Sequence, residues 1–150
     1  LSLSWQQNSA VGRELSVKPD KTAQAVERML GEVQSLKARC AGLEEAEFHR
    51  LAEEYRGAGN VLLVQPSMEP DSVRRLCDAV SRTCSGRCAV FAGTDGGYKY
   101  AVIHPEQDIT PFMKAMNAAL RGRGGGRDGF AQGSAACTEE EIRRFWAENT

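Results

Sequence analysis

The longest periodic pattern in the chain is an apolar stripe that follows Asp20. Apolar residues recur there at spacings of three and four, which is typical of one face of an α-helix. The stripe consists of Val26, Met29, Leu30, Val33, Leu36, Cys40 and Leu43. Helix-favouring residues continue as far as Gly57, so we expect a long helix over 20–57 with Asp20 as its N-cap. The sequence leaves open whether Gly42 bends this helix or reverses it into a helical hairpin.

After the Gly57-Ala58-Gly59 break, shorter patterns take over. A continuous apolar run is typical of a buried strand, and Thr94-Asp95-Gly96-Gly97 between two apolar runs predicts an antiparallel hairpin. The expected elements are a strand at 61–64, a helix from Asp71, strands at 88–93 and 98–103, a helix from Thr110, a short strand at 130–132 and a helix from Thr138. This order predicts an α/β (α+β) fold: a small mixed sheet flanked by helices, with a protruding N-terminal long helix or helical hairpin.

Length and composition set the domain organisation. A chain of 150 residues with 41% hydrophobic content supports one core. Because the chain starts with Leu1, we interpret residues 1–19 as a connector from a missing upstream domain, 20–57 as a coiled-coil-like helix and 58–150 as the α/β domain. No apolar stretch approaches the roughly 20 residues of a membrane span, so no membrane partner is expected.

The cysteines indicate the cellular compartment, and the net charge limits the kind of nucleic-acid site that the chain can carry. The five cysteines are odd in number and no secretory signal accompanies them, which predicts reduced thiols in a cytoplasmic protein. The net charge is −1, from 19 basic and 20 acidic residues. Any nucleic-acid site must therefore be a local basic patch.

The segment from Arg121 to Gly133 is the best candidate for such a patch. Consecutive glycines let backbone N–H groups converge on an anion, and arginine binds phosphate oxygens bidentately. The candidate phosphate-binding residues are Arg121, Arg123, Gly124, Gly125, Gly126, Arg127 and Gln132. The segment lacks the lysine and Ser/Thr of a Walker loop, so no nucleotide cofactor follows. The alternative interpretation is a solvated glycine loop without a ligand.

The same segment resembles a known family. Gly124-Gly125-Gly126-Arg127 followed by Ala131-Gln132-Gly133 is similar to the Gly-Gly-Gly-Arg-x-x-x-Ala-Gln motif in the C-terminal domain of alanyl-tRNA synthetases. That domain belongs to the DHH-associated family, which also follows RecJ-like phosphoesterase domains. In the family at large the glycine run precedes His, so Arg127 favours the synthetase-like branch. Leu15 to Pro19 looks like the segment that follows the editing domain in these synthetases and in AlaX-type editing proteins.

The resemblance implies a non-catalytic C-terminal module that binds tRNA(Ala) and forms a homodimer. Its parent would be an aminoacyl-tRNA deacylase or an alanyl-tRNA synthetase, and the short connector favours the long AlaX form. The implied dimer contact is the stripe, with Val26, Met29, Val33, Leu36 and Leu43. Two alternatives stay open: the substrate-binding domain of a DHH-type phosphoesterase, or a purely structural dimerisation domain.

Catalytic and metal-binding motifs are missing from the sequence. Editing domains of this family bind zinc through His-x-x-x-His and a later Cys-x-x-x-His, whereas His49 and His104 are the only histidines here. No Asp-His-His motif occurs either. We therefore expect no catalytic residue, metal or cofactor in this chain, and zinc only in the missing editing domain.

Several other polar or reactive residues have a structural interpretation. We expect Cys84 and Cys88 to be buried thiols and Asp95 to form the hairpin turn. Tyr98 and Tyr100 alternate with a lysine and are predicted to face the core. A basic group on the second helix and its exit suggests either RNA contact or a solvated helix face; it comprises Arg74, Arg75, Arg82 and Arg87.

Overall fold

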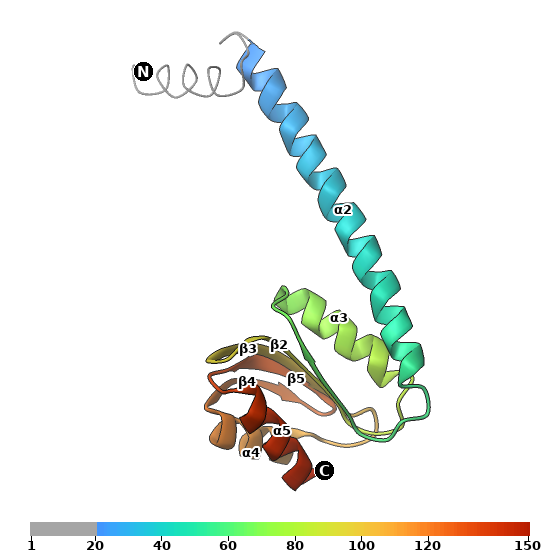
Figure 1. The fold of residues 1–150 in the computed structure, drawn as a ribbon, viewed down its shortest axis with the longest axis vertical. Coiled ribbons are helices and arrows are strands. Elements are labelled where there is room, and N and C mark those ends of the chain that lie inside the picture. The colour runs from blue at the N-terminus through green and yellow to red at the C-terminus, as the bar shows by residue number, and fades with distance from the viewer. Residues whose placement is uncertain (1–20) are drawn as a thin grey trace. The chain divides into compact units, whose positions relative to one another are not determined.

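The computed structural model of the protein describes residues 21–150; the connector predicted at 1–19 and the Asp20 cap lie outside them. Helix α2 (Thr22–Glu54) continues through Gly42, so the helix does not turn back there. The chain divides into two compact units at the boundary between Leu43 and Glu44. The last turns of α2 therefore belong to the C-terminal unit, which holds all the other described elements (Figure 1).

A five-stranded mixed sheet forms the centre of the C-terminal unit. Its strands are β1 (Val61–Gln65), β2 (Cys88–Thr94), β3 (Gly97–Ile103), β4 (Gly122–Arg127) and β5 (Phe130–Ala135). They lie in the order β1-β2-β3-β5-β4. β1 pairs with β2 in parallel, and all other pairs are antiparallel. The predicted α/β class with a small mixed sheet is confirmed, as is the hairpin between β2 and β3.

Three helices cover the sheet: α3 (Pro70–Ser81) on one face, and α4 (Thr110–Leu120) and α5 (Glu139–Asn149) on the other (Figure 1). α3 begins one residue before the predicted Asp71, with Glu69 as N-cap, because proline suits the first helical turn. α5 begins with the predicted capping box between Thr138 and Glu141.

Two hydrophobic cores fill the spaces between the sheet and the helices. Phe91, Tyr98 and Tyr100 pack with α4 and α5, and both tyrosines are less than 5% exposed, which confirms their predicted place in the core. On the other face, alternate residues of β1, β2 and β3 pack with α3 and with Phe48 at the end of α2. Cys84 is buried on that side, as predicted.

The structure corrects the prediction of a glycine loop, because residues 122–127 form the edge strand β4. Glycine is depleted in strands, so the local sequence gave no strand signal. Packing explains the composition: a Cβ on Gly124 would lie 2.5 Å from the Gln132 carbonyl oxygen and 2.6 Å from both the Gly133 Cα and the Tyr100 hydroxyl. Gly125 points to the opposite side of the sheet, where nothing lies within 4 Å of such a Cβ.

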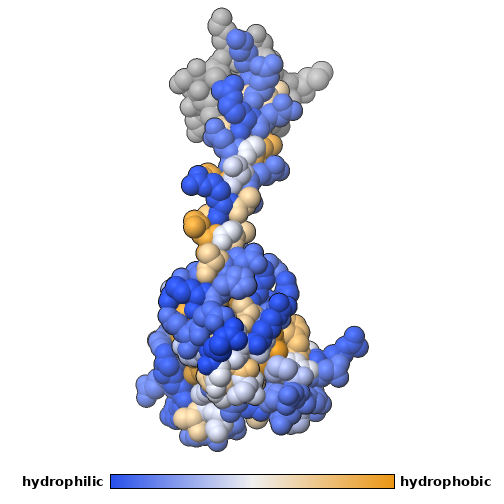
Figure 2. Space-filling model, turned by 90° about the vertical axis from the view of Figure 1, so that its right-hand side faces the viewer, coloured by the Kyte–Doolittle hydropathy of each residue, from blue (hydrophilic) through white to orange (hydrophobic). Residues whose placement is uncertain are grey.

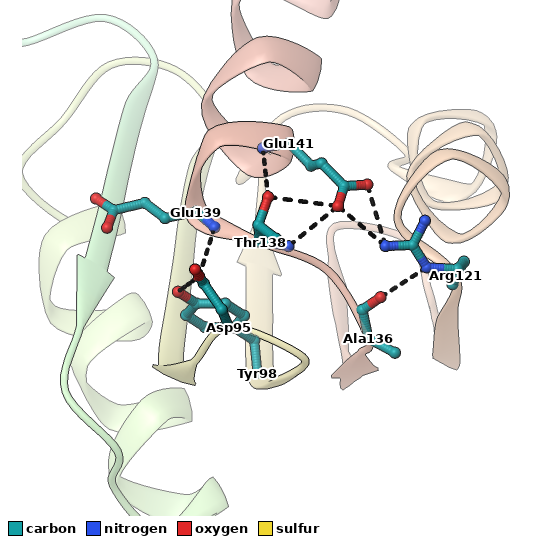
Figure 3. Close-up of polar contacts among 7 residues, drawn as sticks. All are labelled: Asp95, Tyr98, Arg121, Ala136, Thr138, Glu139 and Glu141. Atoms are coloured by element: carbon teal, nitrogen blue, oxygen red, sulfur yellow. Dashed lines mark hydrogen bonds and ion pairs between the residues drawn. The ribbon is translucent and has the colours of Figure 1, made fainter.

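Polar contacts attach the start of α5 to two hairpins (Figure 3). Arg121 Nε donates to the Ala136 carbonyl at 2.7 Å, and its Nη2 donates to the two Glu141 carboxylate oxygens at 3.0 and 3.1 Å. At the β2–β3 turn, Asp95 Oδ1 accepts from the Glu139 backbone N–H at 3.0 Å. Arg121 thus acts as a clamp between the β4–β5 hairpin and α5.

Arg121→Ala should lower the melting temperature, and the loss should depend on pH. Hydrogen bonds from Arg121 are the main reason why the pKa of Glu141 lies below its ordinary value of 4.5. A carboxyl group whose pKa is lowered by folding stabilises the protein above its unfolded pKa, and this stabilisation is lost as the pH falls through the folded pKa. Thermal unfolding followed by circular dichroism should therefore show a larger deficit for the variant at about pH 7 than at about pH 3. The matched control Arg123→Ala should leave the melting temperature unchanged. An equal decrease in the melting temperature of both variants would contradict the role of Arg121 as a clamp.

Alanine substitutions at two adjacent glycines should have different effects on stability. Gly124→Ala forces backbone atoms of β4 and β5 apart and should lower the free energy of unfolding by about 1–3 kcal/mol. Gly125→Ala enters open space and should leave it unchanged or raise it by about 0.5 kcal/mol. Urea unfolding of both variants measures the difference, and a large loss in Gly125→Ala would show that β4 is not paired as described.

Candidate nucleic-acid interface

Part of one sheet face carries no helix. α3 packs on β2 and β3, while the residues of β5 and β4 on the same face extend beyond it. Side chains alternate along a strand, so the register places three residues from each of β3, β5 and β4 on this side. We call these nine residues the open face. They form three rows: Lys99, Ser134 and Arg123; Ala101, Gln132 and Gly125; Ile103, Phe130 and Arg127.

The charge of the open face is uniformly positive. Lys99, Arg123 and Arg127 are exposed, and the nine residues include no acid. None of these three cations forms an ion pair with a described residue, whereas most arginines of the C-terminal unit do. They are therefore available to an anionic ligand, and their spread across two strands suits several phosphates better than one.

The middle row of the open face is flat and carries one polar group. Gly125 has no side chain, Ala101 is buried, and the exposed amide of Gln132 stands between them. An amide both donates and accepts hydrogen bonds, so Gln132 can contact a sugar or a base edge. Because β4 and β5 do not need a glycine at position 125 for their own packing, the missing side chain leaves room for a ligand.

The turn that joins β4 to β5 is anchored. The Ile109 backbone N–H donates to the Asp128 carbonyl, and the His104 N–H donates to the Gly129 carbonyl, both at 2.8 Å. Arg127 therefore extends from a hairpin whose tip is fixed to the β3–α4 loop. Beside it lies a shallow hollow whose lining includes His104, Arg127 and Phe130.

The structure separates the predicted phosphate-binding residues into three groups. Arg123, Gly125, Arg127 and Gln132 lie together on the open face. Gly124 and Gly126 face α4, across a small groove that also includes Lys114 and Asn117. The guanidinium of Arg121 is held by Glu141 and Ala136. Sequence analysis missed Lys99 and Ser134, which only the strand register brings beside Arg123.

The basic group on α3 and its exit is mostly neutralised by neighbouring acids. The pairs are Arg74 with Asp71, Arg75 with Asp71 and Glu44, and Arg82 with Asp78. Arg87 instead stacks 3.9 Å from the centroid of the Phe112 ring, and burial lowers its pKa. The ion pairs of Arg74, Arg75 and Arg82 agree with the solvated helix face that the sequence offered as one interpretation, whereas the half-buried Arg87 does not belong to such a face.

Helix α2 carries a second surface, in the N-terminal unit. Figure 2 shows hydrophobic side chains on the outside of the helix. All five residues of the predicted dimer stripe are exposed to at least 39%: Val26, Met29, Val33, Leu36 and Leu43. A row of exposed apolar side chains of this kind is unusual on a monomer.

Residues 21–150 carry neither a candidate metal-ion site nor a helix that could span a membrane. No three His, Cys, Asp or Glu side chains in this range are grouped so that they could hold a metal ion. Within the same range, no helix combines the length and apolar character needed to cross a bilayer.

Comparison with known proteins gives one family and several similar folds. The model of the DHHA1 domain matches residues 58–148. RecJ from Thermus thermophilus in complex with Mn²⁺ is similar with a TM-score of 0.56 and 22% identity, over 91% of this chain and 22% of that chain. The C-Ala domain of Aquifex aeolicus alanyl-tRNA synthetase is similar with a TM-score of 0.48 and 16% identity, over 59% of this chain and 91% of that one. A search of curated protein sequences finds no significant match.

The similarity to RecJ shows a shared fold only, because the sequence identity is low and this chain spans about a fifth of the length of that protein. The DHHA1 match covers more than half of the chain, and it includes all five strands together with α3, α4 and nearly all of α5. The chain therefore belongs to the DHHA1 domain family.

Proposed function

We propose that this chain is a non-catalytic module of an alanyl-tRNA synthetase-related editing protein, and that it binds tRNA through the open face and self-associates through α2. The observation that carries the RNA part is the open face itself, where Lys99, Arg123 and Arg127 have no acidic partner among the described residues. Arg127 after the glycine run is also the residue that resembles the synthetase-like branch. In this proposal catalysis and zinc belong to another domain of the parent protein.

Binding should depend on phosphate contacts. The net charge is −1, so attraction comes from the local arrangement of cations and should weaken steeply with salt. Gln132 and the backbone of β4 at Gly125, which no side chain covers, add contacts to sugars or bases. These contacts would make the chain bind some regions of a tRNA more tightly than others. Self-association would then place two open faces in one assembly and raise the apparent affinity.

A second candidate function is the binding of a small nucleotide, as in the substrate-binding domain of a DHH-type phosphoesterase. The hollow beside the β4–β5 turn favours it, because Arg127, His104 and Phe130 could contact a phosphate and a base there. Asp78 and Asp128 also line this hollow and would repel an anion. The open face shares Ile103, Arg127 and Phe130 with this hollow, but it also carries Lys99 and Arg123, which do not line the hollow. It therefore suits a polynucleotide better.

Arg123→Ala combined with Arg127→Ala should weaken tRNA(Ala) binding roughly tenfold or more at low salt. Each lost phosphate contact should also reduce the slope of log K against log[salt] by about 0.7–0.9. Fluorescence anisotropy with labelled tRNA(Ala) over a series of salt concentrations measures both quantities. The matched control Arg143→Ala with Arg144→Ala removes the same charge from α5, and it should change neither quantity by more than about twofold.

The same assay separates the alternatives. Equal losses in both double variants would mean that binding follows total charge and would contradict a site on the open face. Displacement of the tRNA by a mononucleotide would favour the phosphoesterase-type function. If the chain binds neither tRNA nor a mononucleotide, a purely structural role as a dimerisation domain would be the remaining function.

A further inference from the structure

The sheet has an uncovered edge at β4. This strand is the last in the order of the sheet, and it lies next to α4 (Figure 1). Arg127 and Phe130 close a two-residue turn, so this pair exchanges both of its ladder hydrogen bonds, and bonded pairs alternate along the hairpin. Every second residue of β4, counted back from Arg127, therefore bonds to β5. The residues between them, Gly124 and Gly126, direct their backbone N–H and C=O groups outward.

These outward groups are accessible and mostly unpaired. Gly124 and Gly126 are exposed, and because glycine has no side chain, the exposed part is the backbone. None of the described residues accepts a hydrogen bond from either N–H, and the Gly124 carbonyl accepts one long bond, from the Asn117 amide at 3.4 Å. A carbonyl oxygen has two lone pairs, so a second donor still has a place there. An edge with free backbone groups is a template for an added strand.

A groove beside this edge can hold side chains of an added strand. It lies between β4 and α4, has a volume of about 180 Å³, and its lining includes Ile109, Met113, Lys114 and Asn117. The volume is below the roughly 300 Å³ of the smallest typical ligand pockets, so the groove suits single side chains. Peptides that bind by strand addition use this combination of main-chain hydrogen bonds and pockets for every second side chain.

Charge determines which kind of strand fits. Lys114 flanks the edge on the α4 side, and Arg123 and Arg127 flank it on the open face; all three are exposed. No acid lines the groove. A second copy of this chain fits poorly, because an antiparallel pair of β4 edges centred on Gly125 would set Arg123 of one copy against Arg127 of the other. The edge therefore favours an acidic strand.

We propose that the β4 edge binds an extended acidic segment of a partner protein as a sixth, antiparallel strand of the sheet. The two-residue period places the side chains opposite Gly124 and Gly126 on the α4 side, in the groove, and the alternate ones on the open face. The segment thus alternates small aliphatic residues with acidic ones. Antiparallel addition continues the pairing of β4 with β5 and is the more stable arrangement. The inference does not rest on the proposed RNA binding, because its main-chain contacts lie at the edge of the sheet.

The peptide acetyl-Glu-Val-Glu-Val-Glu-amide matches this pattern and is the probe. Titration into the ¹⁵N-labelled 150-residue chain, followed by NMR, gives its dissociation constant. In antiparallel pairing the two valine amides face β4, and the central glutamate amide faces away. N-methylation of both valines should therefore raise the dissociation constant roughly tenfold or more. N-methylation of the central glutamate is the matched control and should change the constant by less than about threefold.

Hydrogen exchange locates the added strand. The Gly124 and Gly126 amides lack an acceptor among the described residues of the free chain, and strand addition supplies one to each. Saturating peptide should slow their exchange roughly tenfold or more. The Gly125 amide already faces β5 and serves as the internal control, so its exchange should slow by less than about threefold.

Charge reversal tests the contribution of α4. Lys114→Glu should raise the dissociation constant of the peptide roughly tenfold, because the variant sets a like charge beside the acidic strand. Arg144→Glu makes the same change of charge at an exposed position of α5 and should have an effect of less than about twofold. Unchanged melting temperatures of both variants verify folding.

The outcomes separate the inference from the proposed function. No binding at about 1 mM peptide would overturn the inference. Equal effects of N-methylation at valine and at glutamate would also overturn it, because charge alone would then attract the peptide. If tRNA(Ala) slows the exchange of Gly124 and Gly126 and the peptide does not, the edge belongs to the RNA site, so the inference fails while the proposed function stands. Peptide binding with the expected pattern would support the inference even in a chain that does not bind tRNA.

Discussion

The C-terminal unit depends on the close pairing of β4 with β5, which only glycine permits. The Tyr100 hydroxyl and the backbone around Gly133 occupy the space that a side chain at Gly124 would need. Tyr100 donates to Asn117 Oδ1 of α4 at 2.9 Å, and the Asn117 amide donates to the Gly124 carbonyl at 3.4 Å. These contacts hold the edge strand between β5 and α4.

The position of β4 determines the roles of its arginines. Arg121 precedes the strand in the left-handed region, with φ 53°, and turns toward α5. Arg123 and Arg127 lie within the strand, where the two-residue period directs both to the open face. Three arginines that look equivalent in the sequence therefore have different functions: one clamps a helix, and two are available for a ligand.

The fold was largely predictable because most elements carry strong local signals. The hairpin at Asp95, the capping box at Thr138 and the apolar run at Val61 each specify an element from a few residues. β4 was missed because its strand state is imposed by pairing with β5 and not by its own residues. The site was only half predictable for the same reason. Arg123 and Gln132 share a motif, but Lys99 lies more than twenty residues earlier, and only the register across β5 brings it to the same row.

The proposed RNA surface on the open face depends on the glycine strand β4. Titration of tRNA(Ala) into the ¹⁵N-labelled chain, followed by NMR, tests it most directly, because glycine amides mark β4 in the spectrum. If tRNA binds there, the largest chemical-shift changes should fall on residues 122–127 and 130–134. Changes confined to α5 or α2, with the β4 amides unaffected, would contradict it.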